Sequence, residues 1–128
     1  QRFIQISGSN NDVLFEAFLQ FIGNIKDGCT TDVIPESYGE YGLCATNPIP
    51  VRGIAANEVY LNQIELENGD PIQWCRLGST IANNINGCID MYTITTLAGD
   101  NVCTLYISPY QNTISGIAPK GFRIKSEQ

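Results

Sequence analysis

The sequence contains no histidine among its 128 residues, and its seven lysines and arginines are outnumbered by thirteen aspartates and glutamates. Catalytic serine and cysteine nucleophiles of the common triads need a histidine base, so such chemistry within this chain is excluded. The net charge of -6 is opposite in sign to that of a protein that binds phosphate backbones. No apolar run approaches the roughly 18 to 20 residues that cross a bilayer. We expect no nucleic-acid partner and no membrane span.

The usual metal-binding patterns are missing as well. The five cysteines are 15, 31, 13 and 15 positions apart, and no Cys-x-x-Cys pair is present to anchor zinc. The acidic residues are scattered, without the Asp-x-Asp-x-Asp-Gly pattern of a calcium loop. We therefore expect no metal and no cofactor. Whether the protein is an enzyme stays open, and a non-enzymatic role is favoured.

Cysteine usage bears on the cellular compartment. Five cysteines are more than a cytosolic domain needs, and the chain opens on Gln1, so we expect that a preceding segment was removed. Cys29 and Cys44 bracket half of a long loop, where a disulfide would stabilise the fold by about 3 kcal/mol. The alternative is that both are reduced and that Cys75 and Cys103 are buried strand residues. The compartment stays open, with a secreted or periplasmic location favoured.

Residues 1–128 are expected to form a single α+β domain. A helix is predicted over about 11–27, because Ser9 and Asp12 form a capping pattern ahead of apolar residues at helical spacing, and Gly28 follows. A long irregular loop is predicted over about 28–57, where prolines and glycines prevent any long regular element. The amphipathic N-terminal helix is expected to pack on an antiparallel sheet.

Two hairpins are predicted to build that sheet. The first spans about 58–77 around the turn at Asn68-Gly69, and the second spans about 89–108 around the turn at Gly99. In the second hairpin, Cys103 and Leu105 alternate with polar residues and would share one face. An irregular C-terminal segment follows, with a last short strand expected within 114–124. Since no edge lysines block its edges, such a sheet would also allow a homodimer.

Five residues are candidates for binding. Tyr38 and Tyr41 form an aromatic and acidic cluster in the long loop, and Glu58, Tyr60 and Arg76 supply polar groups near the first hairpin. The first hypothesis is a non-enzymatic interaction domain that presents tyrosines and acids to a protein or glycan. The second is a small-ligand or enzymatic domain with a polar pocket around Arg76. The third is an accessory domain of a larger secreted protein.

Several of these positions also have simple structural explanations. Arg76 lies beside a Gly-Ser turn that would suit an anion, yet an ion pair with an acid across the hairpin explains it equally well. Trp74, the sole tryptophan, is expected to anchor the core.

Four short segments occur in order along the chain: Asn47-Pro48-Ile49-Pro50-Val51, Glu58 with Tyr60-Leu61, Arg76-Leu77-Gly78-Ser79, and Ala118-Pro119-Lys120-Gly121-Phe122. Together they resemble a family of small bacterial domains without an assigned activity. The resemblance spans roughly residues 44 to 123 and implies no catalytic residue.

Overall fold

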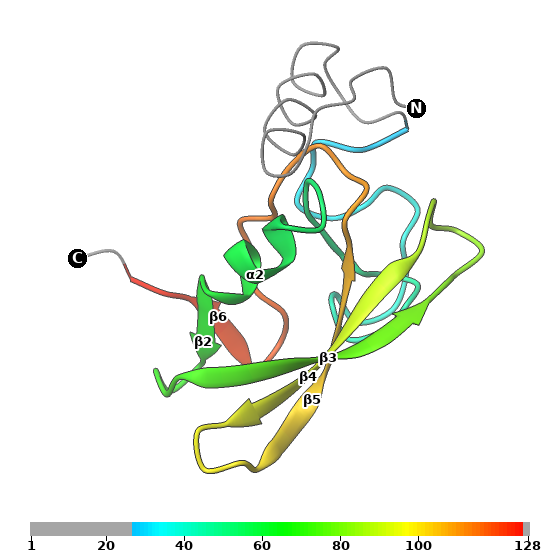
Figure 1. Ribbon diagram of the computed structural model, residues 1–128. Helices are drawn as coiled ribbons and strands as arrows, with labels where there is room; N and C mark the ends of the chain where they lie inside the picture. The colour runs from blue at the N-terminus through cyan, green and yellow to red at the C-terminus, as the bar shows by residue number, and fades with distance from the viewer. Residues whose placement is uncertain (1–26, 127–128) are drawn as a thin grey trace, which may run out of the picture.

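The computed structural model describes residues 27–126, which form a mostly β domain with two sheets (Figure 1). The larger sheet has the strand order β1-β5-β4-β3, and the smaller one pairs β2 with β6. The elements are β1 (Ile49–Pro50), α2 (Ala56–Leu61), β2 (Ile64–Leu66), β3 (Ile72–Thr80), β4 (Ile89–Thr96), β5 (Asn101–Ser108) and β6 (Phe122–Ile124).

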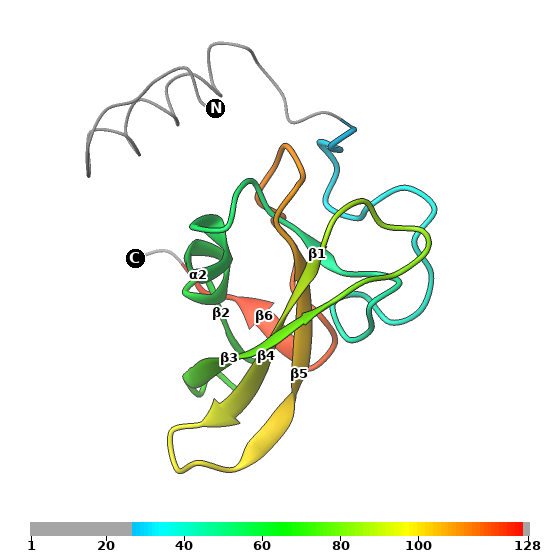
Figure 2. The same ribbon diagram turned by 45° about the vertical axis from the view of Figure 1, so that its right-hand side comes forward.

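The predicted α+β class is wrong. Within residues 27–126 the only α-helix is α2, six residues long, and no N-terminal amphipathic helix packs on a sheet there. The helix predicted over about 11–27 lies outside the described residues except for its last position. The prediction took local apolar spacing as evidence for what covers the sheet. That covering is supplied by α2 and by the β2–β6 pair, which lie on the same side of the large sheet (Figure 2).

The first predicted hairpin is also wrong. Residues 58–61 belong to α2, and β2 pairs with β6 in antiparallel register instead of with β3. The buried residues of α2, Ala56, Asn57, Tyr60 and Leu61, follow the spacing of one helix face. The turn itself forms, with the amide of Leu66 donating to the carbonyl of Asp70 at 3.0 Å. The two strands that flank this turn belong to different sheets, β2 to the smaller one and β3 to the larger one.

The segment predicted as the second hairpin does form one. β4 and β5 pair antiparallel, with Tyr92 opposite Leu105 and Ile94 opposite Cys103. β1 lies parallel to β5, with Ile49 opposite Ile107. The segment predicted as an irregular loop therefore contributes one strand to the large sheet, and its last two residues begin α2.

The main core lies between the large sheet and the layer made of α2, β2 and β6. Its members include side chains with no solvent exposure from both layers: Ile49, Tyr60, Leu61, Ile94, Leu105 and Ile107. A smaller cluster of Ile34, Ile85 and Ile89 covers one end of the opposite face. This arrangement holds β3 at one edge of the sheet.

Candidate functional site

β3 is the most exposed strand of the large sheet. It is nine residues long and pairs with β4 on one side, and no other strand of residues 27–126 pairs with its outer edge. Leu77 is 59% exposed, and Ile81, directly after the strand, is 74% exposed. We define the β3 edge surface as the outer edge of β3 with these exposed side chains: Gln73, Cys75, Leu77, Ser79 and Ile81.

The sequence anchors β3 from its inner side. Ile72 is buried and Trp74 packs against the main core, as expected for the sole tryptophan. The register is regular from Ile72 to Arg76 and then shifts, because Arg76 lies opposite Tyr92 while Gly78 lies opposite the neighbouring residue of β4. Leu77 is the extra residue of this β-bulge and has no partner on β4. The bulge leaves its side chain at the surface.

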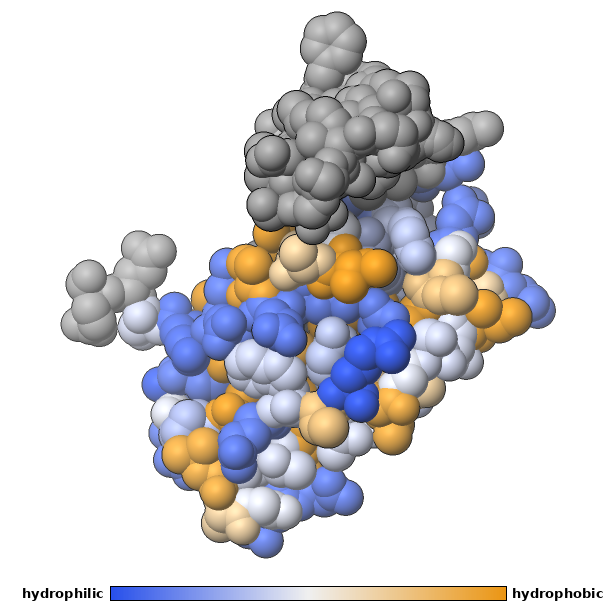
Figure 3. All heavy atoms as spheres, viewed as in Figure 1, coloured by the Kyte–Doolittle hydropathy of each residue, from blue (hydrophilic) through white to orange (hydrophobic). Residues whose placement is uncertain are grey.

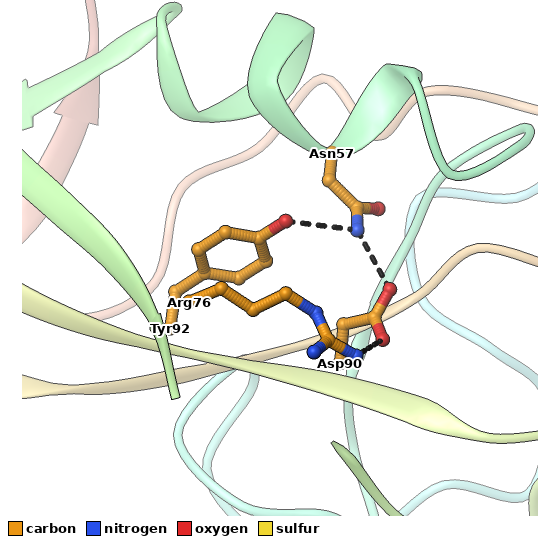
Figure 4. Close-up of polar contacts among 4 residues, drawn as sticks. All are labelled: Asn57, Arg76, Asp90 and Tyr92. Atoms are coloured by element: carbon orange, nitrogen blue, oxygen red, sulfur yellow. Dashed lines mark hydrogen bonds and ion pairs between the residues drawn. The ribbon is translucent and has the colours of Figure 1, made fainter. Parts of the chain in front are cut away.

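Beneath the middle of β3 lies a polar cluster of four residues, Asn57, Arg76, Asp90 and Tyr92 (Figure 4). Arg76 Nη2 lies 3.0 Å from Asp90 Oδ1. The amide Nδ2 of Asn57 donates to Asp90 Oδ2 at 2.7 Å and to the hydroxyl oxygen of Tyr92 at 3.2 Å. The cluster thus ties α2 to β4 and fixes Arg76 on the edge strand.

Burial differs sharply within this cluster. Asn57 is fully buried and Asp90 is 5% exposed, whereas the side chain of Arg76 is 55% exposed. Only one nitrogen of the guanidinium engages Asp90, so its other N–H groups are available to a ligand at the surface. Asn57 Oδ1 is buried without a hydrogen-bond partner among the described atoms, because the amide is oriented by its donation to Asp90.

Tyr41 and Tyr60, both predicted to bind a partner, are placed together but turned inward. The hydroxyl of Tyr60 donates to the carbonyl of Ile117 at 2.6 Å, and that of Tyr41 lies 2.6 Å from Ser115 Oγ. Burial raises the pKa of Tyr41 to about 12. Burial, together with the adjacent Tyr41, also raises the pKa of Tyr60 well above its usual value. These hydroxyls hold the C-terminal segment in place.

The remaining predicted residues are not brought into this cluster. Tyr38 is 63% exposed, and Glu58 is exposed in the first turn of α2. Within residues 27–126, no hydrogen bond or ion pair joins either side chain to Arg76. The ion pair predicted for Arg76 across the first hairpin does not form, and Arg76 pairs instead with Asp90 on β4. The positions that sequence reasoning missed are Asn57, Asp90 and Tyr92. Only the β3–β4 register would have revealed the last two.

Of the two alternatives for Cys29 and Cys44, the disulfide is not present and the reduced thiols are. All five cysteines lie in the described region and are free thiols. Cys44 Sγ contacts the carbonyl of Glu40 at 3.4 Å, and Cys29 Sγ contacts that of Thr31 at 3.8 Å, so each thiol turns toward its own local backbone. Cys103 is half-buried, and burial raises its pKa to about 11.

A hollow of about 360 Å³ lies between the long loop and the segment before β4, lined in part by Cys29, Asn84 and Gln111. The amide of Gln111 is used by the fold, since its Oε1 accepts from the amide of Cys29 and its Nε2 donates to Ser108.

No group of three metal-ligating side chains occurs in the described part of the chain. No helix between residues 27 and 126 is long and apolar enough to cross a membrane.

Most of the segments that carry the family resemblance serve the fold. Pro50 in β1 and Pro48 just before it are fully buried, and Phe122 joins the main core from β6. Comparison of the sequence with protein families, curated proteins and solved structures finds no match. The resemblance to small bacterial domains therefore stays a prediction.

Proposed function

We propose that the protein is a non-enzymatic interaction domain that binds an extended segment of a protein partner along the β3 edge surface. The observation that carries this proposal is the long outer edge of β3, which is unpaired within residues 27–126. Proteins usually protect such edges with prolines, lysines, very short strands or β-bulges. β3 contains no proline or lysine, and its bulge at Leu77 lies beyond the regular stretch from Ile72 to Arg76. At nine residues, it also exceeds the typical strand length of about 5 to 6.

The chemistry of the surface suits strand addition. Backbone amides and carbonyls of the regular part, Ile72 to Arg76, would supply affinity, and exposed side chains would supply specificity. Leu77 and Ile81 add aliphatic area at one end; Figure 3 shows apolar surface on the right-hand lobe, where β3 leads into the loop before β4. Arg76, the only charged residue of β3, favours a partner segment with a carboxylate nearby.

The same features favour a protein over a glycan. Glycan binding would draw on exposed aromatic rings, but Tyr60 is fully buried and Tyr41 is half-buried, leaving Tyr38 as the exposed tyrosine among the predicted three. A ligand pocket around Arg76 is less favoured, because the Arg76 side chain is 55% exposed at the edge of the sheet, whereas ligand pockets enclose most of the ligand surface. An accessory role within a larger secreted protein is compatible with strand binding.

The proposal is tested by selecting binders from a phage-displayed library of linear peptides on the wild-type protein. Selected peptides are then titrated against two variants, Leu77→Lys and the matched control Leu97→Lys, whose leucine is 63% exposed in the β4–β5 turn. We expect at least tenfold weaker binding to Leu77→Lys and unchanged binding to Leu97→Lys. Equal affinity for both variants, or no enrichment of peptides, would overturn the proposal.

A further inference from the structure

We propose that the strand bound along β3 is β3 of a second copy of this chain, in an antiparallel dimer whose two-fold axis passes beside Cys75. This inference rests on the proposed function, because it uses the same β3 edge surface. It joins the two four-stranded sheets into one continuous sheet across the interface.

Symmetry limits the registers that such a dimer can adopt. A two-fold axis between antiparallel strands runs perpendicular to the sheet, so the core-facing side of one copy continues into the core-facing side of the other. Residues directly opposite each other must therefore share a face. In the regular part of β3, Ile72 and Trp74 belong to the core side and Cys75 belongs to the opposite side. The axis must pass beside one residue, which then lies opposite its own copy.

The side chains of β3 decide beside which residue the two-fold axis can pass. An axis beside Arg76 sets two guanidinium groups opposite each other, which is unfavourable. An axis beside Leu77 falls on the bulge, where the ladder is already irregular. An axis beside Trp74 pairs only residues 72–76 of each copy within β3, whereas an axis beside Cys75 pairs residues 72–78. The axis beside Trp74 also brings Pro71, which has no amide hydrogen to donate, opposite Leu77.

The register centred on Cys75 separates the two guanidinium groups, keeps the axis off the bulge and moves Pro71 to the end of the ladder, opposite Ser79. It places Arg76 of each copy opposite Trp74 of the other, on the same face, where a guanidinium over an indole ring is attractive. It places Gln73 opposite Leu77, both exposed in the single chain. Alpha carbons of opposed residues lie about 4.5 to 5.5 Å apart in antiparallel strands. This range falls within the separation that a disulfide spans, so two Cys75 thiols would be in position to be cross-linked.

Charge adds a second expectation. Each copy carries a net charge of -6, so the two copies repel at long range, while the only charged side chain of β3 is the positive Arg76. Salt screens the repulsion between whole molecules more than the short-range contact. We therefore expect the dimer to tighten as the salt concentration rises, which is the opposite of an assembly held by complementary surface charges.

Sedimentation velocity over a concentration series tests the dimer. We expect wild type and Leu97→Lys to dimerise reversibly, and Leu77→Lys to dimerise at least tenfold more weakly. A monomer at every concentration overturns the inference. If selected peptides still bind along β3 in that case, the proposed function stands and its partner is another protein.

Cross-linking tests the register. Diamide accepts two electrons and two protons from a pair of thiols, so opposed Cys75 residues would form one disulfide between copies while diamide is reduced. We expect a dimer on non-reducing gels for wild type and for Cys88→Ser, whose cysteine is the other exposed one. We expect at least a tenfold loss of that band for Cys75→Ser. A band that persists in Cys75→Ser, or that depends on Cys88, contradicts the register.

Discussion

Replacing Asp90 with alanine tests the polar cluster that holds β3 and α2 together. Asp90 is 5% exposed and accepts a hydrogen bond from Asn57, which is fully buried. Its removal leaves the amide of Asn57 with the Tyr92 hydroxyl as its remaining partner. We expect this loss to dominate the effect, because a buried donor that loses a charged acceptor cannot turn to water.

The magnitude follows from the two contacts of the carboxylate. A hydrogen bond to a charged group contributes about 1.5 to 3 kcal/mol. The ion pair adds at most about 1 kcal/mol, because the Arg76 side chain is half exposed and screened by solvent. Asp90→Ala should therefore lower the free energy of unfolding by about 3 kcal/mol. Arg76→Ala, which leaves the contact with Asn57 intact, should lower it by about 1 kcal/mol.

Urea unfolding followed by tryptophan fluorescence measures both values, since the sole tryptophan, Trp74, packs against the core. The wild-type slope of free energy against urea must be retained for the comparison to hold. An Arg76→Ala loss equal to or larger than the Asp90→Ala loss would refute the reasoning, because the exposed ion pair would then outweigh the buried hydrogen bond.

Three further outcomes are expected. Burial raises the pKa of Tyr41 from about 10 to about 12, so its contribution to stability is complete below pH 10 and is lost as the pH rises to 12. The free energy of unfolding, measured from pH 9 to 12, should therefore fall less steeply for Tyr41→Phe than for wild type. Cys103, with a pKa of about 11, should react with iodoacetamide at pH 8 far more slowly than exposed Cys88, as read by mass spectrometry of a time course. Gly42→Ala should cost more stability than Gly53→Ala in thermal unfolding. Both glycines have positive φ, but the new Cβ at Gly42 would lie 2.8 Å from a proline carbon, while the one at Gly53 would meet nothing within 4 Å. Equal losses would show that backbone strain alone accounts for both.

Local sequence patterns predicted only the local parts of this fold. The β4–β5 hairpin follows from strict alternation and a short turn, so Cys103 and Leu105 share the core side as expected. The turn at Gly69 was also visible in the sequence. What its flanking strands pair with was not, because β2 finds its partner more than fifty residues away in β6. Pairing over that distance depends on which apolar faces are left uncovered in the assembled core.

The candidate site shows the same limit. Arg76 is identified from its residue type, but the ion pair expected for it lies across a first hairpin that does not form. Its actual partner, Asp90, depends on the register between β3 and β4 and on the bulge beside Leu77. Tyr41 and Tyr60 were expected to face a partner, since tyrosine is common at interfaces. Long-range hydrogen bonds to Ser115 and Ile117 turn them inward, and no local pattern encodes those contacts.

The central claim, that the outer edge of β3 is the contact surface, is tested most directly by residue-resolved amide hydrogen exchange. The wild-type protein is measured alone at low concentration and then with a saturating selected peptide. The account predicts that amides between Ile72 and Leu77 that do not pair with β4 exchange rapidly in the protein alone and become protected with the peptide. It predicts no such change in Leu77→Lys. Protection that appears on other strands while β3 exchanges unchanged would contradict it.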